Sequence, residues 1–139
     1  MRLPLTGGCL CGGVRFELSE PLVVATYCHC TRCQRRTGSA AAASARMAPG
    51  SLTVTAGAEL VTAYVPAEGF AKDFCGRCGS ALWARHPDDP EVRMIRLGTF
   101  DDDPGIRPSA RQFVAYAATW EPIPDDGLPR YPERRPPDA

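Results

Sequence analysis

The chain has 139 residues, a length that suits one domain with a single buried core. Its apolar fraction of 44% and charged fraction of 23% are those of an ordinary globular protein rather than a disordered one. The 16 basic and 16 acidic residues cancel to a formal net charge of zero, so no general electrostatic attraction to nucleic acid or anionic membranes is expected.

Short β-rich runs recur along the chain and alternate with Gly and Pro. These punctuating residues leave little room for helices of more than a few turns, so an all-β domain is predicted. In chain order, the expected strands are residues 14–18, 22–27, 52–55, 60–65, 81–85, 92–97 and 113–120.

Two segments need a separate interpretation. Residues 38–48 are ambiguous, because their alanines favour a helix that Ser39 could cap, while the rest of the chain is typical of β-structure. After Trp120 the chain is rich in Pro and charge, and residues 132–139 have nothing to bury. We therefore expect a single domain of residues 1–131 and a disordered tail of residues 132–139. Trp83 and Trp120 are expected in the core.

The N-terminus and the cysteine count bear on the cellular compartment. Residues 1–8 lack the apolar centre of a signal peptide, and no stretch approaches the roughly 20 apolar residues of a membrane span, so a cytoplasmic location is expected. Seven cysteines are many for a reducing compartment, where disulfides rarely persist. Metal binding is therefore the leading explanation for these cysteines.

Four of the cysteines form two pairs with the spacing of metal ligands. Cys9 and Cys11 are a C-x-C pair, whose side chains point to the same face of an extended strand. Cys75 and Cys78 are a C-x-x-C pair, whose neighbouring glycines allow a tight turn around a metal. Four thiolates at about 2.3 Å make a closed tetrahedral zinc site of the structural type. The alternative is a set of unrelated buried or redox-active cysteines.

Cys28, Cys30 and Cys33 combine a C-x-C pair with a C-x-x-C turn and can converge on a second ion. Three protein ligands with an open fourth position are typical of a catalytic zinc. If the segment is extended, His29 points away from its two cysteine neighbours, so it is expected to pack or to support a ligand from behind. The alternative is a merely structural or an empty cluster.

The charge of this second group bears on its chemistry. Three thiolates leave a bound zinc with net negative charge and weak Lewis acidity, which disfavours hydrolysis. Such a site can instead hold an incoming thiol as thiolate at neutral pH. Arg32, Arg35 and Arg36 crowd the third cysteine and could bind the carboxylates of an anionic substrate, the alternative being solvated surface arginines. Asp73 and His86 are the candidates for a distant fourth ligand.

Three cysteine blocks occur in a specific order and spacing: G-C-L-C-G-G-V-R-F at residues 8–16, C-H-C-T-R-C-Q-R-R-T-G-S at 28–39, and F-C-G-R-C-G-S at 74–80. With W-E-P-I at 120–123 and L-P-R-Y at 128–131, they resemble the glutathione-dependent formaldehyde-activating enzyme and centromere protein V family. The resemblance covers roughly residues 7–131.

The resemblance implies an all-β, tent-like zinc fold, shared with a small accessory protein of Rab GTPases, in which residues 38–48 form a strand. It implies a structural zinc at the four paired cysteines and a catalytic zinc at the C-H-C-x-x-C cysteines. The implied activity is that of a carbon–sulfur lyase, combining glutathione with formaldehyde to S-hydroxymethylglutathione while nearby arginines hold the glutathione carboxylates. Family members often carry a His on the C-terminal strand, where this chain has Arg111-Gln112-Phe113.

Two other classes of function stay open. A non-catalytic, zinc-scaffolded module that binds a protein partner would have a dispensable second metal, and a redox thiol switch would form a reversible disulfide. For Cys75 and Cys78 a redox role is disfavoured, because they run into a predicted strand, whereas a thioredoxin-type C-x-x-C opens a helix. Two zinc ions per chain in metal analysis would exclude the redox switch. No nucleic-acid or membrane partner is expected. A homodimer is an open expectation, because exposed edges of small sheets often pair.

Overall fold

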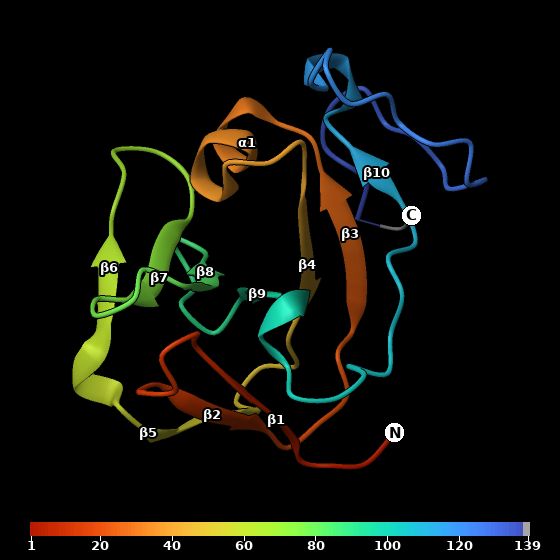
Figure 1. Cartoon of the computed structure of the whole chain (residues 1–139). Coiled ribbons are helices and arrows are strands. Elements are labelled where there is room, and N and C mark those ends of the chain that lie inside the picture. Colours follow the sequence, from red (N-terminus) through yellow and green to blue (C-terminus); the bar gives the residue numbers. More distant parts are fainter. Residues whose placement is uncertain (138–139) are drawn as a thin grey trace.

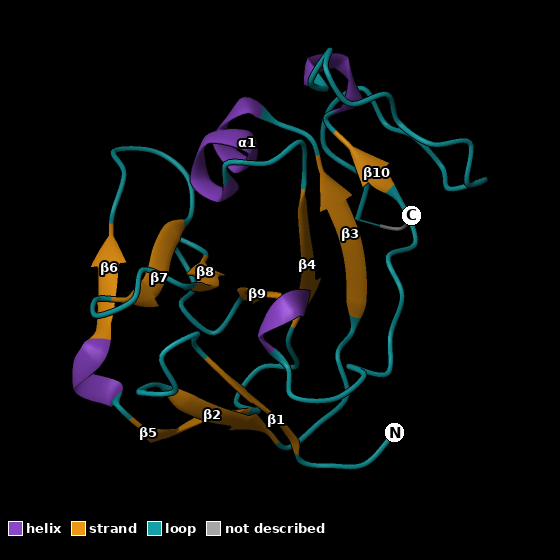
Figure 2. Ribbon diagram, in the orientation of Figure 1, coloured by secondary structure: helices purple, strands orange, loops and turns teal. Residues whose placement is uncertain are grey.

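The computed structural model describes residues 1–137, which form two β-sheets and a single α-helix (Figures 1 and 2). The three-stranded sheet contains, in order, β1 (Leu5–Gly8), β2 (Arg15–Leu18) and β5 (Leu52–Ala56). The seven-stranded sheet contains, in order, β10 (Arg111–Gln112), β3 (Val24–Cys28), β4 (Ala42–Arg46), β9 (Arg93–Arg96), β8 (Ala81–Arg85), β7 (Ala71–Cys75) and β6 (Val61–Tyr64). Helix α1 (Thr31–Thr37) connects β3 to β4, and three short 3₁₀ turns span Ala58–Leu60, Leu97–Thr99 and Val114–Tyr116. The expected all-β class with little helix is confirmed.

The core lies where the small sheet meets the large one (Figure 1). Phe16 and Leu18 of β2 alternate with less buried residues and are 1% and 0% exposed, as expected for a strand with one face on a core. The Phe16 ring meets the Trp83 ring edge-on, with centroids 5.9 Å apart, an arrangement that adds roughly 0.5–1.5 kcal/mol to their burial. The core position of Trp83 is confirmed. The prediction that Trp120 lies in the core is wrong, because its side chain is 65% exposed in a loop beyond the sheet.

Strand register decides which side chains share a face of the large sheet. Cys28 of β3 lies opposite Ala42 of β4, and Ser44, two residues further on, lies opposite Arg96 of β9. Because positions two apart point the same way, these side chains lie on one face. Lys72 of β7 joins the same face through the register of β7, β8 and β9. We call this face the thiol face.

The opposite face, which we call the reverse face, has two differently covered parts. Ala45 and Ile95 lie opposite each other and pack into the core against the small sheet. Tyr27 of β3 lies opposite both Ala43 and Arg111, near the other end of these strands. Figure 1 shows the C-terminal segment running along β3 and β10 at that end.

Residues 38–48 contain a strand and not a helix. Ala42 and Ala45 of β4 are 3% and 0% exposed, and the strand pairs with β3 on one side and β9 on the other. Hydrogen bonds to two neighbouring strands outweigh the modest helix preference of alanine. Gly38 instead ends helix α1, with a left-handed φ of 64° that glycine adopts without strain. The strand implied by the family resemblance is confirmed.

The expected strand at residues 113–120 is wrong. Phe113 has a φ of 57°, which ends β10 and leads into a 3₁₀ turn. The N–H groups of Phe113, Val114 and Ala115 donate to carbonyls of residues 131–133 at 2.9 to 3.2 Å. These bonds to a neighbouring loop replace the strand ladder that the aromatic residues of this segment suggested. Strands β1, β7 and β10 were not among the expected ones.

The expected boundary between a domain and a disordered tail stays a prediction. Residues 138–139 of the expected tail lie outside the described residues. Within the described part, the carbonyl of Glu133 accepts the N–H of Phe113 at 2.9 Å. Among residues 1–137, none of the helical segments has the length and apolar character of a membrane span.

Candidate metal centres and thiol site

Cysteine side chains gather at two places in the structure, in the two groups expected from spacing. The first group contains Cys9, Cys11, Cys75 and Cys78, whose Sγ atoms all lie within 4.8 Å of one another. The Sγ–Sγ distance is 3.5 Å from Cys9 to Cys11 and 3.9 Å from Cys11 to Cys75. A tetrahedral zinc with Zn–S bonds of about 2.3 Å needs sulfurs about 3.8 Å apart. This group, the four-sulfur cluster, could therefore hold a metal ion such as zinc.

Backbone and hydroxyl hydrogen bonds shape the turns that carry the four-sulfur cluster. Gly79 has a φ of 79°, and its N–H donates to the carbonyl of Cys75 at 2.7 Å, which closes the C-x-x-C turn. The Ser80 hydroxyl accepts the N–H of Leu10 at 2.9 Å and joins this turn to the other hairpin. Its contact with Sγ of Cys78, at 3.2 Å, lowers the pKa of that thiol to about 5. The turn thus favours thiolate, the form in which cysteine binds metal.

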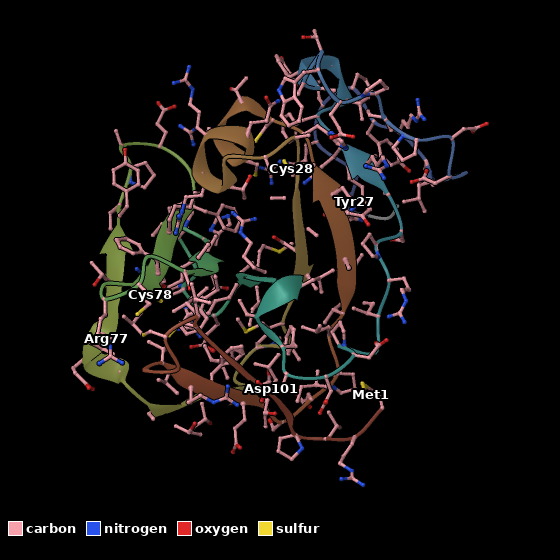
Figure 3. The ribbon with its side chains drawn as sticks, in the orientation of Figure 1. Met1, Tyr27, Cys28, Arg77, Cys78 and Asp101 are labelled. Atoms are coloured by element: carbon pink, nitrogen blue, oxygen red, sulfur yellow. The ribbon has the colours of Figure 1, made fainter. Side chains whose placement is uncertain are left out.

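Arg77 places a positive charge against the four-sulfur cluster, and Figure 3 shows it beside Cys78. Its Nε donates to Sγ of Cys11 at 3.3 Å. The backbone of Gly13 and then the Arg77 side chain lower the pKa of the exposed Cys11 thiol. The N–H of Val14 donates to Sγ of Cys9 at 3.2 Å. These protein donors stabilise negative charge on the sulfurs whether or not a metal is bound.

The second group contains Cys28, Cys30 and Cys33, whose Sγ atoms also lie within 4.8 Å of one another. Cys28 ends β3, where Figure 3 shows it next to α1, and Cys33 lies in the first turn of that helix. Cys30 is the helix N-cap, with its Sγ accepting the N–H of Cys33 at 3.3 Å. A C-x-x-C that caps a helix differs from the one at Cys75, which enters a strand. We call this group the three-sulfur cluster.

Hydrogen bonds among the three thiols shift their pKa values in opposite directions. The side chain of Cys28, followed by that of Cys33, lowers the pKa of Cys30. The same contact with Cys30 is the main reason that the pKa of Cys28 is raised. The cluster therefore carries thiolate charge on Cys30 readily, and this group could hold a second metal ion.

Within residues 1–137, no further Cys, His, Asp or Glu side chain joins the three-sulfur cluster. Asp73 is 4% exposed and accepts hydrogen bonds from Nε and NH2 of Arg85 at 2.5 and 2.9 Å. His86 accepts the N–H of Asp88 through Nδ1 at 3.1 Å and packs edge-on against the Phe70 ring. Neither is a fourth ligand in this arrangement. A tetrahedral metal in the cluster would keep one position open to a ligand from outside.

Positive side chains lie on the thiol face beside this cluster. NH1 of Arg96 donates to Oγ of Ser44 at 2.7 Å, which orients the guanidinium group. Lys72 is half-buried, and its Nζ donates to the carbonyl of Phe70 at 2.9 Å. Burial lowers the pKa of Lys72, while negative charge on Cys33 opposes that shift. The cations therefore balance thiolate charge in the cluster.

Sequence reasoning missed Lys72 and Arg96. Each lies on a different strand from the cysteines, and only the register of the sheet brings them to the cluster. One signal was present: Lys72 is the only lysine of the chain, and it is the sole charged residue of β7 that points away from the core. A half-exposed cation on the face opposite the core is a candidate for binding anions.

The three arginines expected to bind substrate have different surroundings. Arg36 lies over the Phe74 ring, with its guanidinium carbon 5.4 Å from the ring centroid, and Phe74 shares the thiol face with Lys72. NH1 of Arg32 donates to the carbonyl of Glu68 at 2.9 Å, which ties α1 to the loop between β6 and β7. Arg35 is exposed on α1. Their role in substrate binding stays a prediction.

His29 lies on the reverse face, as its position between two cysteines predicted, and is 4% exposed. Its Nε2 is 3.1 Å from NH1 of Arg111. Arg111 also donates from Nε and NH2 to Oδ2 of Asp126 at 3.1 and 2.8 Å, and its guanidinium carbon lies 4.3 Å from the centroid of the Tyr27 ring. The stretch in which family members often carry a His thus places an arginine behind the three-sulfur cluster, not within it.

Comparisons with known proteins identify the family of this chain. The family model described as "Glutathione-dependent formaldehyde-activating enzyme" matches residues 4–116, which include all seven cysteines. A Halomonas elongata protein named "Putative glutathione-dependent formaldehyde-activating enzyme" is 33% identical over 105 residues, covering 71% of this chain and 67% of that protein. The crystal structure of a Rhodobacter sphaeroides protein matches with a TM-score of 0.56 and 28% identity, covering 91% of this chain and 98% of that one. This chain therefore belongs to the glutathione-dependent formaldehyde-activating enzyme family.

Proposed function

We propose that this protein is a zinc-dependent enzyme that adds glutathione or a similar thiol to formaldehyde or a small aldehyde. The observation that carries the proposal is the three-sulfur cluster, which lacks a fourth ligand among the described residues and lies on a face with cationic side chains. Membership of the family supports the same chemistry. Because the reverse reaction releases the thiol from its adduct, the enzyme would be classed as a carbon–sulfur lyase.

Zinc suits both clusters, since four thiolates, or three protein ligands with an open position, are ligand sets that it takes in proteins. In this proposal the four-sulfur cluster holds a structural zinc that joins the turn after β1 to the turn after β7. The three-sulfur cluster holds the catalytic zinc. When bound there, zinc keeps an incoming thiol deprotonated at neutral pH and therefore nucleophilic.

The side chains around the three-sulfur cluster bind and orient the thiol substrate in this proposal. Glutathione has two carboxylates, and Lys72, Arg36 and Arg96 offer cationic groups on the thiol face. Contacts within the protein already hold these three side chains, so little conformational entropy is lost when the substrate binds. In this proposal the exposed Arg32 and Arg35 of α1 contact a carboxylate of the substrate at the rim.

The bond-forming step requires only the thiolate, the aldehyde and a proton from solvent. A lone pair of the thiolate sulfur attacks the carbonyl carbon, the π electrons of the C=O bond move to oxygen, and that oxygen takes a proton from solvent. The product carries a hydroxymethyl group on sulfur. Holding the thiolate and the aldehyde together lowers the entropic cost of their encounter. Because thiols also add to formaldehyde unaided, activity appears as an acceleration.

Exchange NMR on a mixture of glutathione and formaldehyde tests the proposal. We expect the zinc-loaded protein to accelerate exchange between free glutathione and S-hydroxymethylglutathione. Cys30→Ala should abolish this acceleration and lose one zinc per chain, yet stay folded because the four-sulfur cluster is intact. Arg107→Gln changes an exposed ion pair with Asp103 and is the control that should behave like wild type. No acceleration by wild-type protein with both clusters loaded would contradict the proposal.

A further inference from the structure

A cavity of about 270 Å³ lies on the reverse face of the large sheet, behind the strand that ends in Cys28. Its floor includes Ala41 and Ala43, whose small side chains leave room above the sheet. Residues 121–124 of the C-terminal segment line it from the other side. The cavity is thus separated from the three-sulfur cluster by the thickness of the sheet, and nothing in the proposed thiol chemistry uses it.

One wall of the cavity carries two buried polar side chains, His29 at 4% and Arg111 at 8% exposed. A guanidinium group can only donate, so Nε2 of His29, at 3.1 Å from NH1 of Arg111, is the acceptor and Nδ1 carries the proton. Among the described residues this Nδ1 has no hydrogen-bond partner, and it is not sealed off by protein atoms. A nearly buried donor on a cavity wall is therefore left for a ligand.

The charged side chains around the cavity leave hydrogen-bond donors for an anion. Arg111 is one of its lining residues, and the carboxylate of Asp126 is already occupied by an ion pair with Arg111 at 2.8 Å. A second guanidinium, that of Arg130, donates to the carbonyl of Pro124 at 2.9 Å in the segment that covers the cavity. The carboxylate of Glu121 belongs to an exposed residue at the rim. The ion pair of Arg111 with Asp126 is balanced, and the exposed Arg130 and Glu121 are of opposite charge, so no net negative charge opposes an anion here. Arg111 also keeps N–H groups beyond those that contact Asp126 and His29.

We propose that this cavity binds a small organic monocarboxylate. A carboxylate oxygen accepts the Nδ1–H of His29 beside the Arg111 guanidinium, and the hydrocarbon part packs on Ala41, Ala43 and Ile123. A volume of about 270 Å³ lies just below the usual range for ligand pockets, which favours a small ligand over a nucleotide or a tripeptide such as glutathione. The ligand is thus of a different class from the thiol substrate on the opposite face.

Benzoate is a suitable probe, since it joins a carboxylate to a flat hydrocarbon ring, and benzamide is its neutral counterpart. In an NMR titration of ¹⁵N-labelled, zinc-loaded protein, we expect saturable benzoate binding with amide shifts centred on residues 27–29, 40–43 and 111–112 and on Glu121 and Ile123. We expect benzamide to bind about tenfold more weakly, or about 1.4 kcal/mol. Equal affinities would overturn recognition of the carboxylate. No saturation, or shifts centred elsewhere, would overturn the site.

Ala43→Leu tests the same site by filling its floor without removing a polar group, and it should abolish the benzoate shifts. Ala63→Leu on the exposed strand β6 makes the same change outside the cavity and should bind benzoate like wild type. Undiminished binding by Ala43→Leu would overturn the proposal. If that variant does not fold, the comparison of benzoate with benzamide on wild-type protein still tests whether the cavity binds a carboxylate. Neither measurement contains a thiol or an aldehyde, so its failure leaves the proposed enzyme activity untouched.

Discussion

The two cysteine clusters differ in how their ligands are distributed along the chain. Sulfurs of the four-sulfur cluster come from two turns, with Cys11 and Cys75 separated by 64 positions, and Cys75 is 0% exposed. The three-sulfur cluster is contained within residues 28–33, at the end of one strand and the first turn of one helix. A metal in the first cluster would cross-link distant parts of the fold. A metal in the second would be held by one short segment and would keep a position open.

The cationic side chains beside the two clusters differ in what they bind. Beside the four-sulfur cluster, Arg77 donates directly to a sulfur, so its positive charge compensates the negative charge of that cluster. Beside the three-sulfur cluster, Lys72 and Arg96 donate to a carbonyl and a hydroxyl and keep further N–H groups for a substrate. We infer that stability depends mainly on the first cluster and activity on the second.

The largest expected effect contrasts one cysteine from each cluster. Cys75→Ala should lower the free energy of unfolding by at least about 3 kcal/mol, or ~10 °C in Tm, because the loss of a structural metal removes folding energy. Cys33→Ala should change Tm by less than about 3 °C yet remove the acceleration of adduct exchange. Thermal unfolding by circular dichroism, with zinc analysis, measures both. Equal losses of stability in the two variants would break the division between the clusters.

A smaller effect is expected from the cations on the thiol face. Lys72→Met and Arg96→Met should each raise KM for glutathione about tenfold or more, because a hydrogen bond between charged groups contributes roughly 1.5 kcal/mol or more. With 2-mercaptoethanol, which has no carboxylate, KM should stay unchanged. Arg107→Met on an exposed ion pair is the matched control. Equal changes in KM for both thiols would argue against carboxylate binding by these residues.

The smallest effect concerns the support behind the three-sulfur cluster. The side chain of Arg111, and then the N–H of Leu128, lower the pKa of Asp126. A folded-state pKa below the unfolded value of about 3.9 stabilises the protein above that pH, and the contribution disappears as the pH falls through the folded-state pKa. The Tm difference between wild type and Asp126→Asn should therefore be constant near neutral pH and shrink as the pH falls below about 5. A difference that does not depend on pH would show that the ion pair contributes nothing.

Local spacing was enough to predict the two cysteine groups and the direction of His29. Residues two apart share a face of a strand, and residues three apart meet in a turn, so C-x-C and C-x-x-C place their sulfurs together whatever the rest of the chain does. The alternation of buried and less buried residues in β2 is equally local. Local interpretation failed at Phe113, where a positive φ and hydrogen bonds to residues 131–133 replaced the expected strand.

The sequence by itself therefore determined the ligand types, their grouping and the all-β class, because these follow from neighbours along the chain. Only the tertiary structure decided that Lys72 and Arg96 reach the three-sulfur cluster and that Arg111 meets His29 behind it. It also decided that Trp120 lies outside the core. The physical reason is that burial and hydrogen bonding over the whole chain decide which distant strands pair. They also decide which segments pack on each face of a sheet.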